Sequence, residues 1–302
     1  MKLLLETIKE GKILISDGAW GTLLHQAGLQ PGECPELWNI THRDAVYAVA
    51  KSYIDSGADI ILTNSFGGNP IKLEHYDLQD NTEQLNFAAA EISREAAGND
   101  HFVLGSIGPS GKILMMEEIT EQQLYEGFSI QAIALKKGGV DAICIETMSA
   151  LDEACIAVRA AKESTKLEVV CTFTFEKTLL GEFRTLMGVS PEQMVESIIE
   201  AGADVIGTNC GNGFEQMIEI VKAIRKIDNK IPVLVHANAG KPIYENGITI
   251  FPETPEIMTA RVQELIDCGA NIIGGCCGTT PAHIAALSRE IKKINESYYK
   301  SN

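Results

Sequence analysis

The chain has 302 residues, of which 45% are hydrophobic and 22% charged, proportions that are ordinary for a globular protein with a sizeable core. Its formal net charge of −16 argues against a nucleic-acid or anionic-membrane partner, because both are themselves negatively charged. The N-terminal apolar run covers only residues 3–5, too short for a signal peptide, and no run approaches the ~18 residues of a membrane span. We therefore expect a cytoplasmic protein whose eight cysteines stay reduced.

Short β-branched apolar runs alternate with stretches that carry apolar residues at helical spacing. The predicted strands are 12–16, 59–63, 102–107, 141–146, 168–173, 204–208, 232–237 and 271–275. The predicted helices are 42–56, 82–97, 120–138, 150–164, 191–202, 214–227, 255–268 and 281–294. Such alternation predicts parallel strands joined by crossover helices.

Eight strand–helix units in 302 residues predict an α/β fold, a (β/α)8 TIM barrel that forms a single domain over residues 1–302. A doubly wound open sheet is the alternative, and it is less favoured because no strand is followed by G-x-G-x-x-G. The connections 17–41 and 238–253 are longer than a barrel needs. Both follow strands, so we expect them to wall in a pocket at the C-terminal end of the barrel.

Three cysteines directly follow predicted strands: Cys210 in TNCGNG, and the neighbours Cys276 and Cys277 in GGCCGTTP. Thiolates that converge at strand ends would form a three-cysteine zinc site with one open coordination position, which is typical of catalytic zinc. Neighbouring residues of a strand face opposite sides, so both could reach one metal only if the strand has ended. A redox pair, or a Cys276 that merely packs, remains the alternative.

Two carboxylates also stand at strand ends: Asp17 follows the first strand, and Glu146 ends the otherwise apolar fourth. A carboxylate there is costly unless it is paired or solvated, so the two would suit a ligand that carries an ammonium group as well as a thiol. Asp17 could instead cap a turn, and Glu146 could pair with an arginine. His236 could donate a hydrogen bond to the site, although a satisfied core histidine is the simpler interpretation. Other candidates at strand ends are Thr63, Asn64, Ser65, Phe66, Asn209 and Asn238.

These motifs together resemble the zinc-dependent homocysteine S-methyltransferase family, and in particular the homocysteine-binding domain of cobalamin-dependent methionine synthase. The matching segments span most of the chain: DGAWGT (17–22), TNSFGGN (63–69), GSIGPSG (105–111), ETMSALDEA (146–154), TNC (208–210), NAGKP (238–242) and GGCCGTTPAHI (274–284).

The resemblance implies a zinc ion bound by Cys210, Cys276 and Cys277, and an S-methyltransferase that activates homocysteine as a zinc thiolate to give methionine. By the same resemblance, Asp17 and Glu146 would hold the amino group of homocysteine. The implied substrate-binding set is completed by Thr63, Ser65, Phe66 and Asn209.

The methyl donor is less constrained by the sequence. The chain lacks the D-x-H-x-x-G signature of a cobalamin domain, and Gly67 and Thr147 stand where betaine-using relatives carry aromatic residues. We therefore expect a methylcorrinoid carried by a partner protein. The alternatives are S-methylmethionine as donor, a corrinoid-linked demethylase of a methylated small molecule, and a non-catalytic binding barrel. Departures from the family pattern at Met187, Val189 and Asn212 are expected at the pocket mouth.

Overall fold

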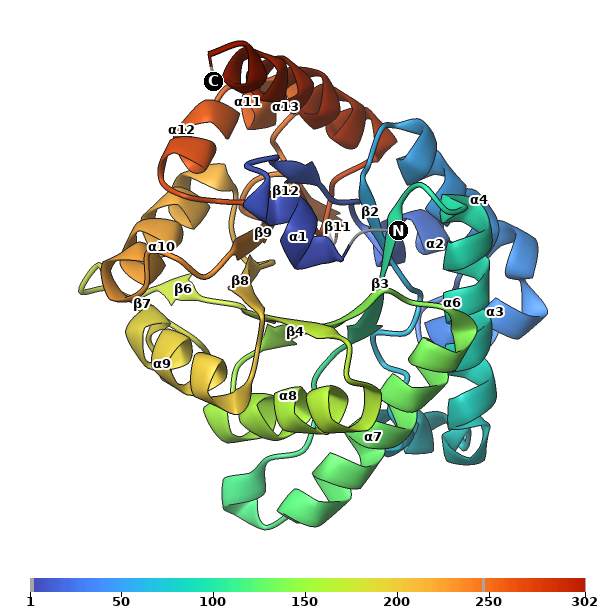
Figure 1. Cartoon of the computed structure of the whole chain (residues 1–302). Coiled ribbons are helices and arrows are strands. Elements are labelled where there is room, and N and C mark those ends of the chain that lie inside the picture. The colour runs from blue at the N-terminus through green and yellow to red at the C-terminus, as the bar shows by residue number, and fades with distance from the viewer. Residues whose placement is uncertain (1–2, 246–247, 302) are drawn as a thin grey trace.

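The computed structural model describes residues 3–245 and 248–301, and within them eight parallel strands form one ring (Figure 1). The strands are β1 (Leu14–Ile15), β2 (Ile60–Leu62), β3 (Phe102–Ile107), β4 (Ala142–Met148), β5 (Glu168–Phe173), β8 (Val205–Asn209), β9 (Val233–Ala237) and β12 (Ile272–Gly275). Their order is β1-β12-β9-β8-β5-β4-β3-β2. A parallel bridge between Ser16 and Ile60, with Asp59 N donating to Ile15 O at 2.7 Å, closes the ring. The predicted TIM barrel is confirmed.

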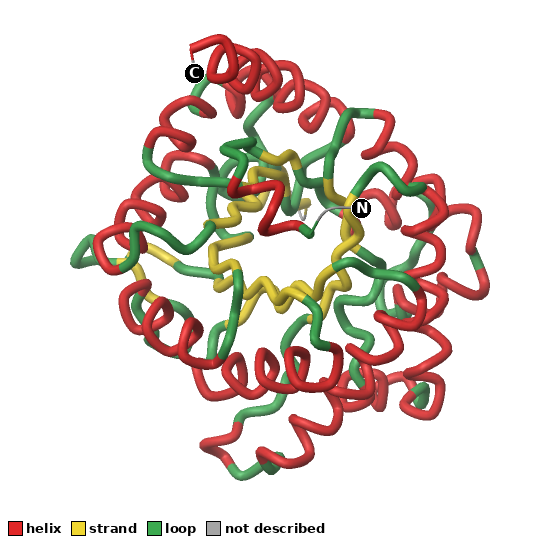
Figure 2. Tube along the Cα trace, viewed as in Figure 1, coloured by secondary structure: helices red, strands yellow, loops and turns green. Residues whose placement is uncertain are grey.

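Helices surround the strand ring on the outside (Figure 2). They are α4 (Arg43–Asp55), α6 (Thr82–Ala97), α7 (Glu121–Gly138), α8 (Leu151–Thr165), α9 (Pro191–Ala201), α10 (Phe214–Ile227), α12 (Val262–Asp267) and α13 (Pro281–Ser301). Thr120 and Ser190 begin α7 and α9 with capping boxes, and Gly139 and Gly202 end them in the left-handed conformation. The helix expected over 255–268 is divided into α11 (Pro255–Thr259) and α12.

The apolar core has two layers, one between the strands and the helices and one inside the barrel. The inner layer contains Leu14, Ile60, Leu104, Val170, Val205, Leu234 and Ile272. A helix that the sequence did not predict, α1 (Leu4–Lys9), lies across the ring in Figure 1 and adds Leu4 and Ile8 to this layer. The backbone N–H groups of Leu4 and Leu5 donate to the Glu168 carboxylate, which begins β5. One end of the barrel is thereby covered.

The remaining short elements follow strands and so lie at the C-terminal end of the barrel. They are α2 (Trp20–Gln26), η1 (Pro35–Leu37), α3 (Trp38–Thr41), α5 (Pro70–Leu73), η2 (Glu74–Tyr76), η3 (Gln79–Asn81), η4 (Leu114–Met116) and the hairpins β6 (Glu176–Lys177)–β7 (Phe183–Arg184) and β10 (Ile243–Glu245)–β11 (Ile248–Ile250). Within the described residues, none of the helices combines the length and hydropathy that a transmembrane span requires.

Candidate active site and metal centre

The three predicted cysteines meet at the C-terminal ends of β8 and β12, which lie on either side of β9 in the ring. Their sulfur atoms all lie within 4.8 Å of one another, and the Cys210 and Cys277 sulfurs are 3.7 Å apart. Two thiolates bound at ~2.3 Å to a tetrahedral zinc ion are separated by about 3.8 Å, so the spacing fits that metal. In the described part of the chain, no other group of three such side chains meets this closely.

Neighbouring cysteines can share one site because β12 ends at Gly275, immediately before them. Cys276 N still donates to Ala237 O of β9 at 2.7 Å, and then the chain turns, with Thr279 N donating back to Cys276 O at 3.1 Å. Gly278 has a φ of 79°, and a side chain there would collide with the Phe251 ring. The condition that the strand must end before both cysteines can reach one metal is met.

The pKa values of the three sulfurs favour a single thiolate among them. The Cys276 and Cys277 thiols donate to the Cys210 sulfur, which lowers the pKa of Cys210 to about 3. The same bonds raise the pKa of Cys277 to about 12 and that of Cys276 well above its usual value. One thiolate is therefore stable without a metal, whereas ionisation of all three sulfurs requires a positive charge among them.

Asp17 is buried beside this triad and has no cationic partner among the described residues. Its Oδ2 accepts from Trp20 Nε1 at 2.7 Å and from the backbone N–H of Leu62 at 2.8 Å. Burial raises its pKa to about 6 in spite of these bonds. The carboxylate thus joins β1 to β2 and lines the cavity over the barrel.

Glu146 is the second buried carboxylate of the cavity, and it accepts a hydrogen bond from the Ser106 hydroxyl on β3. Burial raises its pKa to about 7, and the nearby Asp17 charge adds to the increase. The alternative of an arginine partner finds no support, because no ion pair of Glu146 is present within residues 3–245 and 248–301. Two buried carboxylates that line one cavity without an ion pair among the described residues can accept a cationic group.

The 63–66 segment forms the adjoining wall. The Thr63 and Ser65 hydroxyls lie 2.6 Å apart, and Ser65 donates to Ser106 O at 2.7 Å. Phe66 packs its ring against Gly108 and stays 41% exposed at the cavity edge. All three line the cavity, whereas Asn209 is buried and does not line it. Substrate contacts of Thr63, Ser65, Phe66 and Asn209 remain a prediction.

Several residues that line the cavity were not among the predicted site residues. Trp20, Glu36 and Ser106 line it, and Ser106 had a usable signal as a polar residue inside the apolar run FVLGSI. His236 lines it as well, and its Nε2 has no hydrogen-bond partner within the described structure, so it is not a satisfied core histidine. The side chain of Asn238 hydrogen-bonds to the Cys210 sulfur.

The cavity that these residues enclose has a volume of about 320 Å³. The 17–41 connection walls it as expected, through residues such as Trp20 and Glu36. The described residues of 238–253 do not line it, and residues 246–247 of that connection lie outside the described structure. The family departures at Met187, Val189 and Asn212, expected at the pocket mouth, do not line it either. Met187 and Val189 line a separate groove, and Asn212 is buried and donates to Phe175 O at 2.6 Å.

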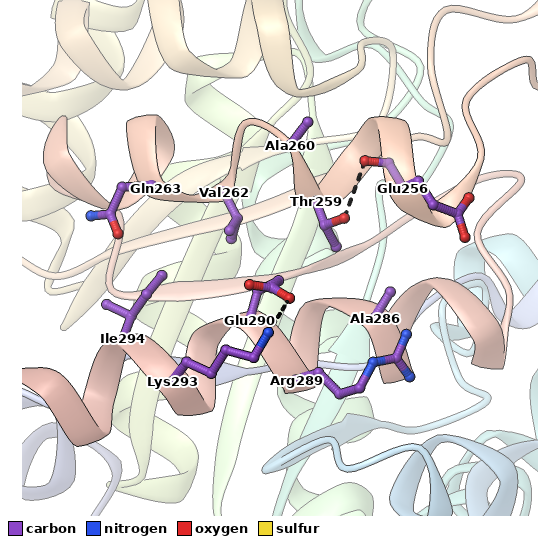
Figure 3. A pocket seen from close by; sticks show the side chains of 10 residues that line it. All are labelled: Glu256, Thr259, Ala260, Val262, Gln263, Ala286, Arg289, Glu290, Lys293 and Ile294. Carbon is purple, nitrogen blue, oxygen red and sulfur yellow. Dashed lines mark hydrogen bonds and ion pairs between the residues drawn. The ribbon is translucent and has the colours of Figure 1, made fainter.

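A larger hollow of about 680 Å³ lies elsewhere, between α11–α12 and α13 on the outer helical layer (Figure 3). Its charged side chains include Glu290 and Lys293, which pair with each other at 2.8 Å. Thr259 donates to the backbone oxygen of Glu256 on the same helix. This is a groove between packed helices, and volume alone does not identify the site.

A (β/α)8 barrel with a thiol triad and two buried carboxylates at its strand ends defines a class of barrel enzyme equipped to bind a metal ion and a cationic ligand. The sequence model of homocysteine S-methyltransferase matches residues 14–291. The chain therefore belongs to the homocysteine S-methyltransferase family, a family of S-methyltransferases.

Its similar proteins include two methionine synthases. The one from Mycobacterium leprae (strain TN) is 30% identical over 311 residues, covering 97% of this chain and 25% of that protein. The one from Mycobacterium tuberculosis (strain ATCC 25618 / H37Rv) is 30% identical over 301 residues, covering 94% and 25%. The chain thus spans about a quarter of the length of these relatives.

Solved structures of the homocysteine methyltransferase MmuM from Escherichia coli share the fold. The metallated form has a TM-score of 0.78 at 21% identity, covering 95% of this chain and 99% of that one. The oxidized form has a TM-score of 0.75 at 22% identity, covering 92% and 96%. At this level of identity the likeness extends to the barrel architecture alone.

Proposed function

We propose that this protein is a zinc-dependent methyltransferase that methylates the thiol of homocysteine to give methionine. The observation that carries the proposal is the thiol triad beside two buried carboxylates without a cationic partner among the described residues. A ligand with a thiol at one end and an ammonium group at the other satisfies both halves of the site. A protein with such thiols suits the reducing cytoplasm, which we propose as its location.

Different residues of the chain would bind the metal ion and the substrate. Cys210, Cys276 and Cys277 would hold zinc, which supplies one effect: it deprotonates a ligated thiol and keeps its sulfur nucleophilic at neutral pH. Asp17 and Glu146 would bind the ammonium group and so orient the sulfur. Trp20 and Ser106 hold those two carboxylates in place.

We infer that the methyl donor is a methylcorrinoid carried by a partner protein. The sulfur–carbon bond would form as the bond between the methyl carbon and cobalt breaks, with the electron pair left on cobalt and the thiol proton released to solvent. The methionine synthases that the chain matches are about four times as long as the region it covers, which leaves room in them for a donor-carrying part.

The rim of the barrel supports a macromolecular donor. Large apolar side chains on the loops that follow β3 and β5 are strongly exposed, with Met115 at 83%, Leu180 at 87% and Leu186 at 92%. Met115 and Leu186 also line one groove of about 630 Å³. Exposed apolar side chains of this kind are typical of protein-binding surfaces, and these lie on loops that follow strands, at the end of the barrel that carries the triad.

The test is a parallel assay of methionine formation with a methylcorrinoid protein, free methylcobalamin, S-methylmethionine and betaine. We expect slow transfer from free methylcobalamin and much faster transfer from the protein-bound corrinoid, since docking turns a random encounter into an oriented one. Fast turnover with S-methylmethionine and none with any methylcorrinoid would refute the proposed donor. Methylation of reduced corrinoid from a methylated substrate, without homocysteine, would identify a demethylase instead.

A further inference from the structure

The side chain of Asn209, the residue before Cys210, connects the strand that ends at the metal site to the strand that carries Glu146. Its Oδ1 accepts from the Thr147 backbone N–H at 2.9 Å and from the Thr172 hydroxyl at 2.8 Å. Its Nδ2 donates to Thr147 Oγ1 at 2.7 Å. Asn209 is fully buried, so these contacts to β4 and β5 use most of its hydrogen-bonding capacity.

Thr147 needs such a restraint because its backbone lies in the left-handed region, with a φ of 63° that a β-branched residue rarely adopts. It belongs to a β-bulge: between the pairs Ile145–Cys171 and Met148–Phe173, β4 has two residues where β5 has one. The two residues of β4 are Glu146 and Thr147. The direction of the Glu146 side chain therefore depends on how this bulge is held.

The backbone of Asn209 is tied to the same neighbouring segment. Its carbonyl oxygen accepts from the Thr174 hydroxyl, just past the end of β5, at 2.9 Å. The next residue, Cys210, also has a positive φ, 61°, and its N–H donates to His236 O at 2.9 Å. Thr147 and Cys210, two non-glycine residues with a positive φ, thus both adjoin Asn209. Thr147 is hydrogen-bonded to the Asn209 side chain, and Cys210 follows Asn209 in the chain.

We propose that Asn209 is a positioning residue that couples the two halves of the pocket. It holds the Thr147 bulge, and through it the Glu146 carboxylate, in register with the strand end that presents Cys210. The inference rests on the proposed function only in taking Glu146 as the ammonium-binding group. Asn209 would act on the substrate through Glu146 and not by contact.

The test is a rescue experiment on zinc-loaded protein. Asn209→Ala should weaken homocysteine binding by ~tenfold or more in calorimetry. Glycine adopts a positive φ without strain, so adding Thr147→Gly to Asn209→Ala should recover most of that affinity. The matched control is Thr165→Val, which removes a buried hydroxyl where α8 ends, at the opposite end of the barrel, and should leave the affinity unchanged.

A second readout needs no ligand. In Asn209→Ala, the amide of Thr147 loses its acceptor, so hydrogen exchange in the 145–148 segment should accelerate by ~tenfold or more. Unchanged protection there would overturn the proposal. A wild-type protein that binds no homocysteine would refute the proposed function, whereas the exchange measurement would still test the role of Asn209.

Two further outcomes bear on the inference. If Asn209 contacts homocysteine directly, Thr147→Gly will not restore the affinity, because relief of backbone strain cannot replace a lost contact. If Asn209→Ala fails to fold, Thr172→Val serves in its place: it removes the hydroxyl that donates to Asn209 Oδ1 and leaves both bonds between Asn209 and Thr147. It should then show a smaller loss of affinity, rescued in the same way, and an affinity equal to that of the wild type would contradict the proposal.

Discussion

At the scale of single residues, burial and mutual contacts shift the pKa values of the ionisable side chains of the site. Three sulfurs lie close together while only the pKa of Cys210 is lowered, and two buried carboxylates have raised pKa values. A metal ion relieves the first group and an ammonium group relieves the second. Both imbalances can be measured separately.

Cys276→Ser should lower zinc occupancy well below one ion per chain and abolish methyl transfer, because it removes one of three thiolate ligands. The barrel should remain folded, since the site lies at the strand ends and outside the apolar clusters. Metal analysis and circular dichroism check both statements, with Cys155→Ser on α8 as a control that keeps its zinc. A full equivalent of zinc in Cys276→Ser would contradict the ligand assignment.

Glu146→Gln should stabilise the metal-free, ligand-free protein at pH 8 but not at pH 5. The folded-state pKa is about 7, above the usual 4.5, so the folded state binds the proton more tightly than the unfolded chain. The ionised carboxylate therefore costs stability above pH 7, on the order of 2 kcal/mol, and that cost disappears as the pH falls toward 5.

Urea unfolding of the two proteins at both pH values measures this difference. Glu91→Gln, on the exposed face of α6, is the matched control and should shift stability equally at pH 8 and pH 5. A Gln variant less stable than the wild type at pH 8 would show that the ionised Glu146 is satisfied by its surroundings.

At the scale of elements, the loops that follow β3 and β5 carry the most exposed large apolar side chains of the described residues. They follow strands and so lie at the same end of the barrel as the cavity, whereas the helix α1 covers the opposite end. The end covered by α1 thus contributes to stability, whereas the opposite end carries the candidate site, a division that is common in this fold.

The double variant Met115→Ser, Leu186→Ser should slow methyl transfer from a methylcorrinoid protein by ~tenfold, because apolar contact area is lost at the docking surface. Its rate with free methylcobalamin should stay the same. Ile227→Ser, at the C-terminal end of α10, removes an apolar side chain that is 42% exposed and lies away from these loops, and it is the control. Equal slowing with both donors would place the effect in the cavity and not in docking.

At the scale of the whole molecule, the barrel and its site are stabilised by different means. Two apolar clusters account for the fold, and neither includes a cysteine of the triad. The metal should therefore add stability to an already folded chain through mass action.

Removal of zinc with a chelator should lower the melting temperature and leave the far-ultraviolet circular dichroism spectrum at 20 °C unchanged. A zinc concentration of ~1,000 times its Kd corresponds to about 4 kcal/mol of added stability. Titration of zinc back into the apoprotein should restore the melting temperature with a midpoint near one ion per chain. Loss of the helical signal on chelation would show that the metal is required for folding.

The order of the barrel elements is encoded in the sequence, and so are most of their bounds to within about two residues; α13, which runs on to Ser301, and the divided 255–268 helix are the exceptions. β3, β5, α6 and α10 lie where the pattern predicted them, because buried strands and capped amphipathic helices are encoded by neighbouring residues. It also placed Cys210, Cys276, Cys277, Asp17 and Glu146 at strand ends, which a parallel barrel necessarily brings to one face.

Only the tertiary structure decided how these residues meet. The Ser106–Glu146 bond, the Asn209 contacts to the Thr147 bulge and the cover that α1 provides each join segments distant in the chain. Such contacts depend on strand register and on one extra residue in β4, which no local periodicity encodes. The sequence therefore predicts which residues form the site, whereas the orientation of their side chains depends on the closed barrel.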